Sequence, residues 1–273
     1  MISVLDKKIL FPGMGAVGAA IGSILSDVIR VPTESFVMKL VSSAIWSALL
    51  AAGIAAGLVW ALELNLRKPS FPRGKVLGAL RAGAFAGAIS GGIAEFIFSS
   101  VALAPGFGQV LFQSACWGLA GALIGSALSK FIANLSRKKA VIGGAVGGFA
   151  GGFSFLMLCT VLPEALGRVI GVGMLGAVLG LCLLMADNLF RSAWLEVIWG
   201  PNESTTLSLG EKPVYLGGGD DDVYIAGLPQ HAVRVVATRG VIQCDQLVGK
   251  GPTFLKAGSE IRLGNVKVVV RTS

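Results

Sequence analysis

The chain has little of what soluble enzymes use for chemistry. Only 14% of its 273 residues are charged, and it contains a single histidine, His231. Its four cysteines form no CxxC pair and no cluster with histidine, so neither a disulfide framework nor a zinc site is indicated. Since no set of acid, base, nucleophile or metal ligands can be assembled, we expect no enzyme activity, no catalytic residue, no cofactor and no metal.

Apolar residues and glycine are abundant instead. Hydrophobic residues make up 54% of the chain, with 39 glycines and a mean hydropathy of +0.77. About 20 apolar residues suffice for a helix to cross a bilayer. We identify six such segments, at residues 10–29, 37–62, 76–103, 107–133, 140–162 and 166–189. The first ends without a small-residue cleavage signature, so we expect no cleavable signal peptide.

Glycine pairs with GxxxG spacing recur in all six segments. The even-numbered segments also end in Asn-Leu, at Asn65, Asn134 and Asn188. This pattern predicts a helical hairpin present three times, over about 7–68, 73–137 and 138–191. The glycine pairs are Gly18/Gly22, Gly53/Gly57, Gly87/Gly91, Gly121/Gly125, Gly147/Gly151 and Gly176/Gly180.

These glycines predict close helix packing. Association of helices in lipid depends on van der Waals contact, and small residues allow the backbones to approach closely. We therefore favour a glycine zipper within one bundle over a glycine-lined pore. Contact between identical subunits, giving a homo-oligomer, stays open as an alternative.

The charges predict the orientation in the membrane. Residues 1–191 contain 15 Lys and Arg against 7 Asp and Glu, whereas residues 192–273 contain 8 of each, so the whole excess lies in the membrane part and no nucleic-acid partner is indicated. Basic residues favour the cytoplasmic side. One side has Lys7, Lys8, Arg67, Lys68, Arg73, Lys75, Arg137, Lys138, Lys139 and Arg191, and the other has Arg30, Lys39 and Arg168, offset by Asp27, Glu34 and Glu164. We expect a multi-pass protein of the cell membrane with both termini in the cytoplasm.

Glu95 is an acid well inside the third segment. A charge at mid-membrane costs about 2.5–3.5 kcal/mol on insertion scales, so we expect this carboxyl to be protonated, paired or turned toward the bundle. Its equivalents in the other repeats, Ser26 and Phe155, are not acidic. No symmetric ion path is therefore predicted, and a role in ion or proton movement is the less favoured alternative.

The pattern changes after residue 191. From Trp194 onward, short stretches alternate apolar and polar residues, with Gly, Asp, Asn or Pro between them, as in Ala232–Gly240 and Val266–Thr272. Many short strands at close spacing predict an all-β sandwich or barrel, here over residues 192–273. It follows Arg191 almost directly, so we expect no flexible linker.

The order of motifs in this tail resembles that of a forkhead-associated (FHA) domain, a β-sandwich that reads phosphothreonine peptides. The resemblance rests on "VYLGG" (Val214–Gly218), "DDVYI" (Asp221–Ile225), "LPQHAVRV" (Leu228–Val235) and "LKAGSEIRLGNVKVVV" (Leu255–Val270), about 75 residues in all. The family's phosphate-gripping arginine falls on Gly218 and its serine on Leu228. No Asn-Gly follows between Val241 and Leu255. Because both side-chain phosphate donors are replaced, the resemblance implies a degenerate domain without phosphothreonine dependence.

The resemblance also implies a role for His231. In the family this histidine braces the binding loops, so a structural role is favoured over ligand contact or catalysis. The acidic run Asp220–Asp222 is expected to be a solvated turn, with a cation site as the alternative. The candidate partner-binding loops contain Gly218, Asp220, Asp221, Leu228, Pro229, Gln230 and His231.

Two functions are consistent with these features. The favoured one is a membrane-anchored scaffolding protein, whose tail binds a cytoplasmic protein and whose bundle lies in the lipid bilayer, with a homo-oligomer left open. The alternative is a channel, transporter or translocation-complex subunit that the β-domain regulates, since parallel hairpin repeats are one known transporter plan.

Overall fold

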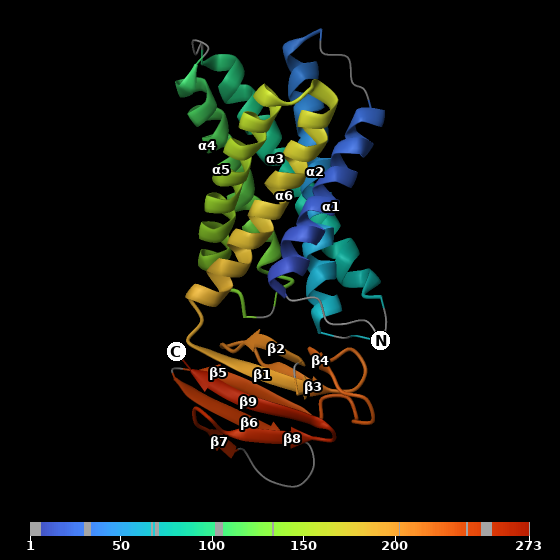
Figure 1. Cartoon of the computed structure of the whole chain (residues 1–273), viewed down its shortest axis with the longest axis vertical. Helices are drawn as coiled ribbons and strands as arrows, with labels where there is room; N and C mark the ends of the chain where they lie inside the picture. The colour runs from blue at the N-terminus through green and yellow to red at the C-terminus, as the bar shows by residue number, and fades with distance from the viewer. Residues whose placement is uncertain are drawn as a thin grey trace.

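The protein consists of a helical bundle stacked on a β-sandwich. The computed structural model describes residues 7–29, 34–66, 68, 71–101, 106–132, 134–201, 203–238, 240–246 and 253–272; Arg30 and Arg67 of the charge argument lie outside this set. The sandwich lies against one end of the bundle (Figure 1), which we call the proximal end; the opposite end is the distal end.

Six helices make up the bundle, and each is long and apolar enough to cross a membrane, as predicted. Ser35 and Ser136 cap α2 and α5 by accepting hydrogen bonds from the backbone N–H of Met38 and Lys139. Several helices extend past the predicted segments, because polar interfacial residues continue the helical turn. Their bounds are α1 Lys7–Val28, α2 Phe36–Asn65, α3 Arg73–Ser100, α4 Phe107–Leu128, α5 Arg137–Val161 and α6 Glu164–Leu189.

The helices form a closed ring in which each packs on its neighbours in sequence, and α6 returns to α1. At five of the six seams, a glycine on one helix lies against the backbone of the next. A methyl group would collide there with a carbonyl oxygen or a Cα atom across the seam. The contacts are Gly18 on Gly53 (α1–α2), Gly87 on Ser47 (α2–α3), Gly121 on Gly144 (α4–α5), Gly147 on Leu179 (α5–α6) and Gly176 on Gly15 (α6–α1).

The second glycine of each GxxxG pair lies against the same neighbouring helix as the first, about one turn away. A methyl group at each of these positions would also meet a backbone carbonyl oxygen of that helix. The contacts are Gly22 on Leu49 (α1–α2), Gly57 on Met14 (α2–α1), Gly91 on Ser43 (α3–α2), Gly125 on Ala140 (α4–α5), Gly151 on Leu175 (α5–α6) and Gly180 on Phe11 (α6–α1).

The glycine pairs do not pack alike in the three predicted hairpins. In the first and third hairpins, Gly18/Gly22 and Gly147/Gly151 contact the second helix of their own hairpin. In the second hairpin, Gly87/Gly91 contact α2 and Gly121/Gly125 contact α5, so both pairs face adjacent hairpins. The sequence repeat is therefore not matched by an equivalent packing repeat.

The α3–α4 seam differs from the other five. Among the described residues, no glycine of α3 or α4 lies against the backbone of the other helix, and these two helices share the fewest contacts of any sequential pair. Trp46 of α2 and Trp117 of α4 meet beside this seam, with ring centroids 5.6 Å apart. At this seam two large rings therefore lie where glycine contacts bring the helices together at the other seams.

The centre of the ring is filled by apolar side chains. Leu50 and Ile54 of α2 and Leu175 and Leu179 of α6 are at most 2% exposed, and with Ile124 of α4 they surround a void of only about 10 Å³. The described side chains are therefore closely packed at this level of the bundle axis.

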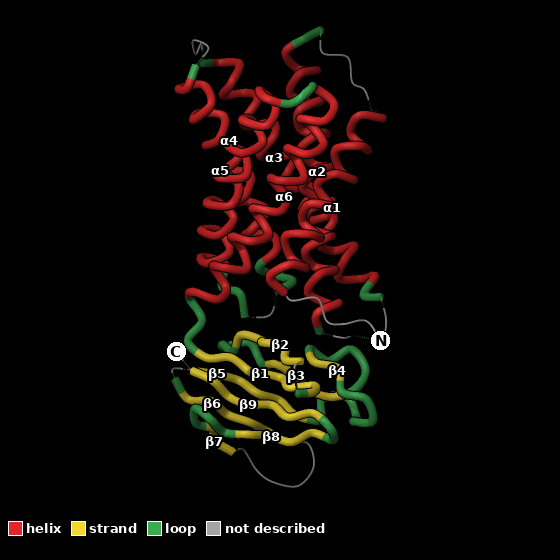
Figure 2. Tube along the Cα trace, in the orientation of Figure 1, coloured by secondary structure: helices red, strands yellow, loops and turns green. Residues whose placement is uncertain are grey.

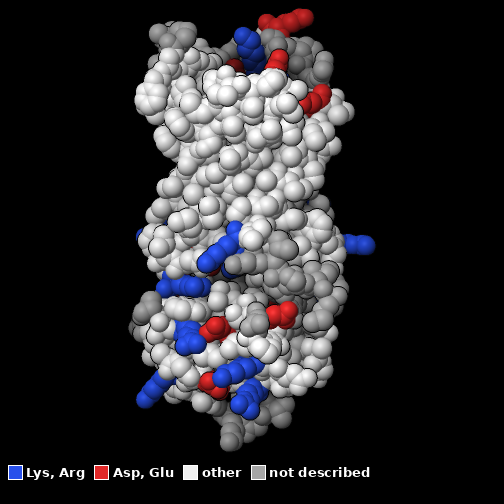
Figure 3. All heavy atoms as spheres, in the orientation of Figure 1, with Lys and Arg blue, Asp and Glu red and all other residues white. Residues whose placement is uncertain are grey.

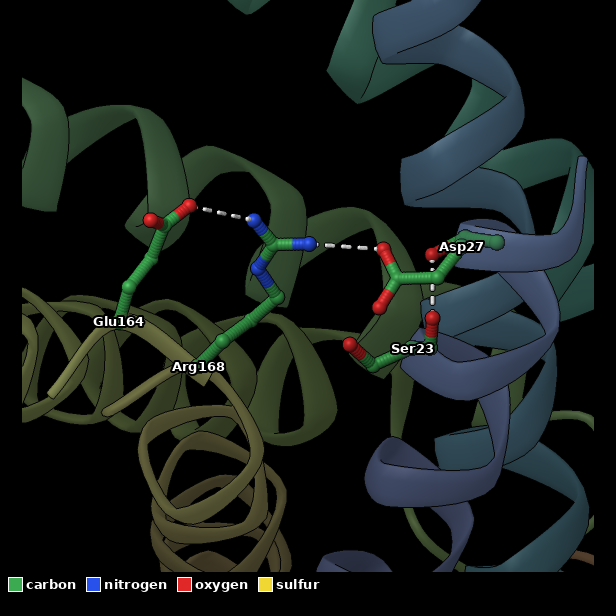
Figure 4. A network of polar contacts seen from close by, with 5 residues as sticks. Ser23, Asp27, Glu164 and Arg168 are labelled. Carbon is green, nitrogen blue, oxygen red and sulfur yellow. Dashed lines mark hydrogen bonds and ion pairs between the residues drawn. The ribbon is translucent and has the colours of Figure 1, made fainter. Parts of the chain in front are cut away.

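On the face drawn in Figure 3, charged residues lie toward the two ends of the bundle. Figure 3 shows a broad band without Lys, Arg, Asp or Glu between a charged cap at the distal end and a mainly basic band near the sandwich. At the distal end, Arg168 of α6 lies 2.8 Å from Asp27 of α1 and 3.4 Å from Glu164 one turn away (Figure 4). All three side chains are more than 40% exposed, so this network contributes little stability.

The sandwich contains two sheets (Figure 2). One has the strand order β2-β1-β9-β8 and the other β4-β3-β5-β6-β7; all neighbours are antiparallel except β3 and β4. The strands are β1 Ala193–Gly200, β2 Glu203–Ser208, β3 Val214–Gly217, β4 Val223–Tyr224, β5 Val233–Thr238, β6 Val241–Gln246, β7 Thr253–Leu255, β8 Glu260–Leu263 and β9 Val266–Thr272.

Alternation along the strands produces the sandwich core, as the period-two pattern predicted. Leu195 and Val197 of β1 point inward with Val268 and Val270 of β9, and all four are fully buried. The alternation of apolar and polar residues also covers residues 222–227 and predicts a strand there, but the observed strand is shorter. Only Val223 and Tyr224 pair in the segment 222–227, because the chain turns at Gly227, which has a φ of +84°.

Candidate functional site: the recognition loops and the domain junction

Asn134 links the bundle to the sandwich. It lies in the α4–α5 connection with a φ of +56°, a conformation that asparagine tolerates better than most residues. Its side-chain amide donates to the Ser208 carbonyl at 3.0 Å, and its Oδ1 accepts from the Lys212 backbone N–H at 3.2 Å. Gly210 lies directly under this amide, where a methyl group would come 2.9 Å from Oδ1. One side chain therefore holds both ends of the β2–β3 turn.

The other two helix exits also hold β2. The Asn65 carbonyl at the end of α2 accepts a hydrogen bond from the Thr205 hydroxyl at 3.3 Å. Near the end of α6, Asp187 accepts from the Ser208 hydroxyl at 2.9 Å, and Lys7 lies 4.0 Å from its second oxygen. The three exits recognised in the sequence thus converge on one edge strand. This docking role was missed by the sequence analysis, although the repeated Asn-Leu exit was its signal.

Glu63 is a buried acid at the proximal end of α2, with 2% of its side chain exposed. Its Oε2 lies 3.0 Å from the ammonium of Lys68 and its Oε1 lies 3.1 Å from that of Lys75. Burial lowers the pKa of Lys68, and the charge of Glu63 opposes this effect. One carboxylate therefore contacts two lysines and connects the end of α2 to the start of α3.

Two clefts separate the bundle from the sandwich on this side. A cleft of about 380 Å³ lies between Glu63, Lys68, residues 71–75 and Asp220 of the sandwich. A second, of about 280 Å³, is lined by Lys75, Lys130 and Asn134 of the bundle and by Lys212 and Asp222 of the sandwich. The α2–α3 connection thus lies beside one of the predicted partner-binding loops.

The candidate loops meet at one end of the sandwich, where Asp221 and His231 join them. The Asp221 side chain is fully buried, and its Oδ2 accepts a hydrogen bond from the His231 backbone N–H at 2.7 Å. Its Oδ1 lies 2.6 Å from His231 Nδ1. His231 has a φ of +58°, and its ring lies 4.4 Å from that of Tyr215.

The position that the FHA resemblance assigns to an arginine is closed in this protein. The Gly218 backbone N–H donates to the Pro229 carbonyl at 3.0 Å, and a methyl group at Gly218 would overlap the Leu228 carbonyl oxygen. Leu228 itself packs against the sandwich core. The two loops therefore meet backbone to backbone, which leaves no room for a side chain at position 218.

The three carboxylates of the acidic run face different partners. Asp221 binds His231, Asp222 accepts from the Tyr215 backbone N–H at 3.0 Å, and Asp220 is exposed and borders the larger cleft. They do not share a central point at which a cation could be held. Beside them, Pro229 and Gln230 are exposed at the tip of their loop.

Glu95 faces a separate cavity, far from these loops. The cavity measures about 320 Å³ and lies between α2, α3, α4 and α5 in the distal half of the bundle. The Ser99 hydroxyl donates to Glu95 Oε1 at 3.1 Å. The Glu95 side chain is therefore turned toward the space between helices, which was one of the three expectations for this acid. It does not lie in the central apolar layer.

Comparison with known proteins gives no relative from which a function could be carried over. No protein-family model matches the chain, and neither the curated proteins nor the solved structures contain a match.

Proposed function

We propose that the protein is a membrane-anchored scaffold whose β-domain binds a cytoplasmic protein partner without requiring phosphothreonine. The observation that carries this proposal is the rigid pair of loops at residues 217–222 and 228–231. Asp221 and His231 join them inside, while Asp220 and Gln230 remain exposed outside. A pre-ordered loop surface loses little conformational entropy when a partner binds.

The FHA-like assignment of the sandwich belongs to this proposal. The two-sheet architecture and the meeting of the two loops at one end support it. Phosphate independence follows from the closed position at Gly218 and from the side chain of Leu228, which has no donor. A phosphate dianion needs an arginine fork or hydroxyl and amide donors aimed at it.

The proximal end faces the cytoplasm in this proposal, because basic residues concentrate there and favour that side. The GxxxG pairs act as packing surfaces inside one chain. Gly18, Gly53 and Gly121 each contact a neighbouring helix of the same chain, so an oligomer would use other surfaces.

The partner surface is a composite of both domains. Asp220 borders a cleft whose other wall is the α2–α3 connection with Lys68 and Arg73. A protein that contacts the loops therefore also meets basic residues at the membrane surface. The test must use the full-length chain, because the isolated sandwich would lose the cover that the three helix exits give to β2.

The experiment compares capture from a cytoplasmic extract by immobilised full-length protein and by variants. We expect Asp220→Arg combined with Gln230→Arg to abolish specific capture. Lys256→Ala, in the exposed turn between β7 and β8, serves as the matched surface control and should retain it. Phosphatase treatment of the extract should have no effect; loss of capture after this treatment, or tight binding of phosphothreonine peptides, would refute the proposal.

One observation favours the alternative of a transport component, namely the cavity at Glu95. Transport would require the central layer of Leu50, Ile54 and Leu179 to open, since these side chains fill the axis. Proteoliposomes that show a flux abolished by Glu95→Gln would establish this function over the scaffold.

A further inference from the structure

The cavity between α2, α3, α4 and α5 combines one acid with several aromatic rings. Glu95 lies on its α3 wall, while Trp46, Phe98, Trp117 and Phe155 contribute rings. The Trp46 and Trp117 rings are inclined at 67° to each other, and Trp117 and Phe155 lie 5.8 Å apart at 73°. The rings therefore form adjoining walls at steep angles, as in an aromatic cage.

Glu95 is the one acidic residue among the described residues that line this cavity. Its lining contains Glu95 but no lysine, arginine or histidine. Among the described residues, no basic side chain forms an ion pair with Glu95, whose hydrogen-bond partner is the hydroxyl of Ser99. A carboxylate and the faces of indole rings both attract positive charge, and the attraction is strongest where water is excluded.

The remaining polar groups cannot supply a metal site. Ser43 and Ser90 donate their hydroxyl protons to the Gly91 and Gly87 carbonyls. Among the described residues, no group of three or more His, Cys, Asp or Glu side chains gathers anywhere. A hard cation requires about six oxygen ligands, whereas Glu95 is the one carboxylate among the described lining residues and four of them are aromatic. A cation with its own apolar substituents satisfies both the charge and the rings.

The site exists because the α3–α4 seam lacks glycine contacts. Elsewhere in the ring a glycine brings two backbones together, whereas here the Trp46 and Trp117 rings lie beside the seam and no described glycine of α3 or α4 meets the backbone of the other helix. The volume of about 320 Å³ lies within the usual range for small-molecule sites, which begins at about 300 Å³.

We propose that this cavity binds an organic cation of the quaternary ammonium class. Glu95 neutralises its charge, and the rings of Trp46 and Trp117 pack against its methyl or methylene groups. This site is separate from the partner-binding loops and does not depend on their function. The same chemistry is found in free quaternary amines and in the choline headgroup of a lipid, two sources that the experiment distinguishes.

The test uses full-length protein in phosphatidylglycerol nanodiscs, which contain no ammonium headgroup. Phenyltrimethylammonium is titrated while tryptophan emission is followed, because Trp46 and Trp117 line the cavity. We expect saturable quenching, and none with benzenesulfonate, an anion with the same ring. Competition by added phosphatidylcholine identifies a lipid headgroup as the source, and lack of competition identifies a free cation.

Matched variants separate binding from folding. Glu95→Gln should weaken binding by about tenfold or more, while Glu164→Gln, an exposed acid at the distal end, should leave it unchanged. Trp46→Leu should weaken binding several-fold, whereas Trp60→Leu, which removes an exposed ring packed on Phe71, should not. Equal binding by the parent and Glu95→Gln, or equal binding of cation and anion, would overturn the proposal.

A second measurement needs no variant. Cys116 lines the cavity, whereas Cys159 is exposed on α5. In the parent protein, saturating phenyltrimethylammonium should slow the reaction of Cys116 with 2-aminoethyl methanethiosulfonate and leave that of Cys159 unchanged. Unprotected Cys116 under saturating cation would contradict the site even if a variant failed to fold.

Discussion

Asp221 holds His231 through both carboxylate oxygens, one on the backbone N–H at 2.7 Å and the other on Nδ1 at 2.6 Å. The acid is fully buried, whereas half of the imidazole is exposed. The only histidine of the chain therefore connects two loops. Its backbone N–H and its imidazole both contact Asp221, and these contacts hold the two loops together. Substitution of Asp221 or His231 should therefore change the order of the two loops more than the properties of their surface.

Replacing Asp221 by Asn should loosen the loops. The amide oxygen can still accept from the His231 backbone N–H. The amide N–H₂ group then replaces the carboxylate oxygen that faces His231 Nδ1. Removing one partner of a buried hydrogen bond costs about 1–3 kcal/mol. Hydrogen exchange of the backbone amides at 218–232 should accelerate. Asp220→Asn, one residue earlier but exposed, should leave exchange unchanged, and equal protection in both variants would argue against the brace.

Placing an arginine at position 218 should destabilise the sandwich without creating phosphate binding. Any side chain at Gly218 meets the Leu228 carbonyl oxygen, and overpacking typically costs about 1–3 kcal/mol. Gly218→Ala should show most of the same loss, because the conflict begins at Cβ. Thermal unfolding and phosphothreonine-peptide titration check this; a Gly218→Arg variant that is stable and binds phosphothreonine would show that the loops can separate.

Asn134→Ala should release the sandwich from the bundle. The substitution removes two hydrogen bonds that cross the domain junction, each worth about 0.5–1.5 kcal/mol. Protease cleavage near residues 208–213 should become faster while the helices stay intact. Asn188→Ala is the control, since Asn188 occupies the same exit position in the third repeat but its side chain forms no hydrogen bond with the described residues. Similar cleavage of the two variants would exclude a specific role for Asn134.

Gly18→Ala should disrupt helix packing, and Gly13→Ala in the same helix should not. A methyl group at Gly18 overlaps the Gly53 carbonyl oxygen, whereas one at Gly13 meets nothing within 4 Å. We expect a loss of about 1–3 kcal/mol from overpacking at Gly18. At Gly13 the change should be neutral or favourable, since alanine favours a helix over glycine by up to about 1 kcal/mol. The thermal aggregation midpoint in detergent measures the difference.

Glu63→Gln should be among the most destabilising single changes, because it leaves the ammonium of Lys68 buried without its counter-charge. Breaking a buried ion pair from one side typically costs about 3–5 kcal/mol. Glu164→Gln, which removes an exposed acid, should cost less than about 1 kcal/mol. Thermal unfolding of the two variants side by side provides the comparison.

The loss in Glu63→Gln should depend on pH with a defined sign. Burial lowers the pKa of Lys68 in the folded protein, and removal of Glu63 takes away the opposing charge. The unfolded chain then binds more protons than the folded one between the folded pKa and the unfolded value of about 10.4. Stability of the variant should therefore recover as the pH rises through that window. A deficit that grows with pH would contradict this assignment.

Much of the architecture could be predicted from the sequence because it depends on local periodicity. Apolar segments of membrane-spanning length predicted the six helices, and period-two alternation predicted the strands that bury Leu195 and Val197. The short pairing of Val223 and Tyr224 could not be anticipated, because it depends on the turn at Gly227 and on a parallel neighbour.

The spacing of the glycine pairs was visible in the sequence, but the helix that each pair contacts was not. Gly53/Gly57 contact the first helix of their own hairpin, whereas Gly121/Gly125, at the equivalent place in the second repeat, contact α5 of the next hairpin. A GxxxG stripe makes one face of a helix flat, and any close neighbour can occupy that face. The choice of neighbour depends on how all six helices close into a ring.

The sequence by itself determined which residues are apolar, that six segments are long enough to cross a membrane, and that Gly218 and Leu228 have no phosphate donor. Only the tertiary structure decided that the helix exits at Asn65 and Asn134 meet one edge strand. It also decided that Trp46 and Glu95 share a cavity. The physical reason is that helix and strand periodicity act over a few residues, whereas these contacts join segments that are tens of residues apart.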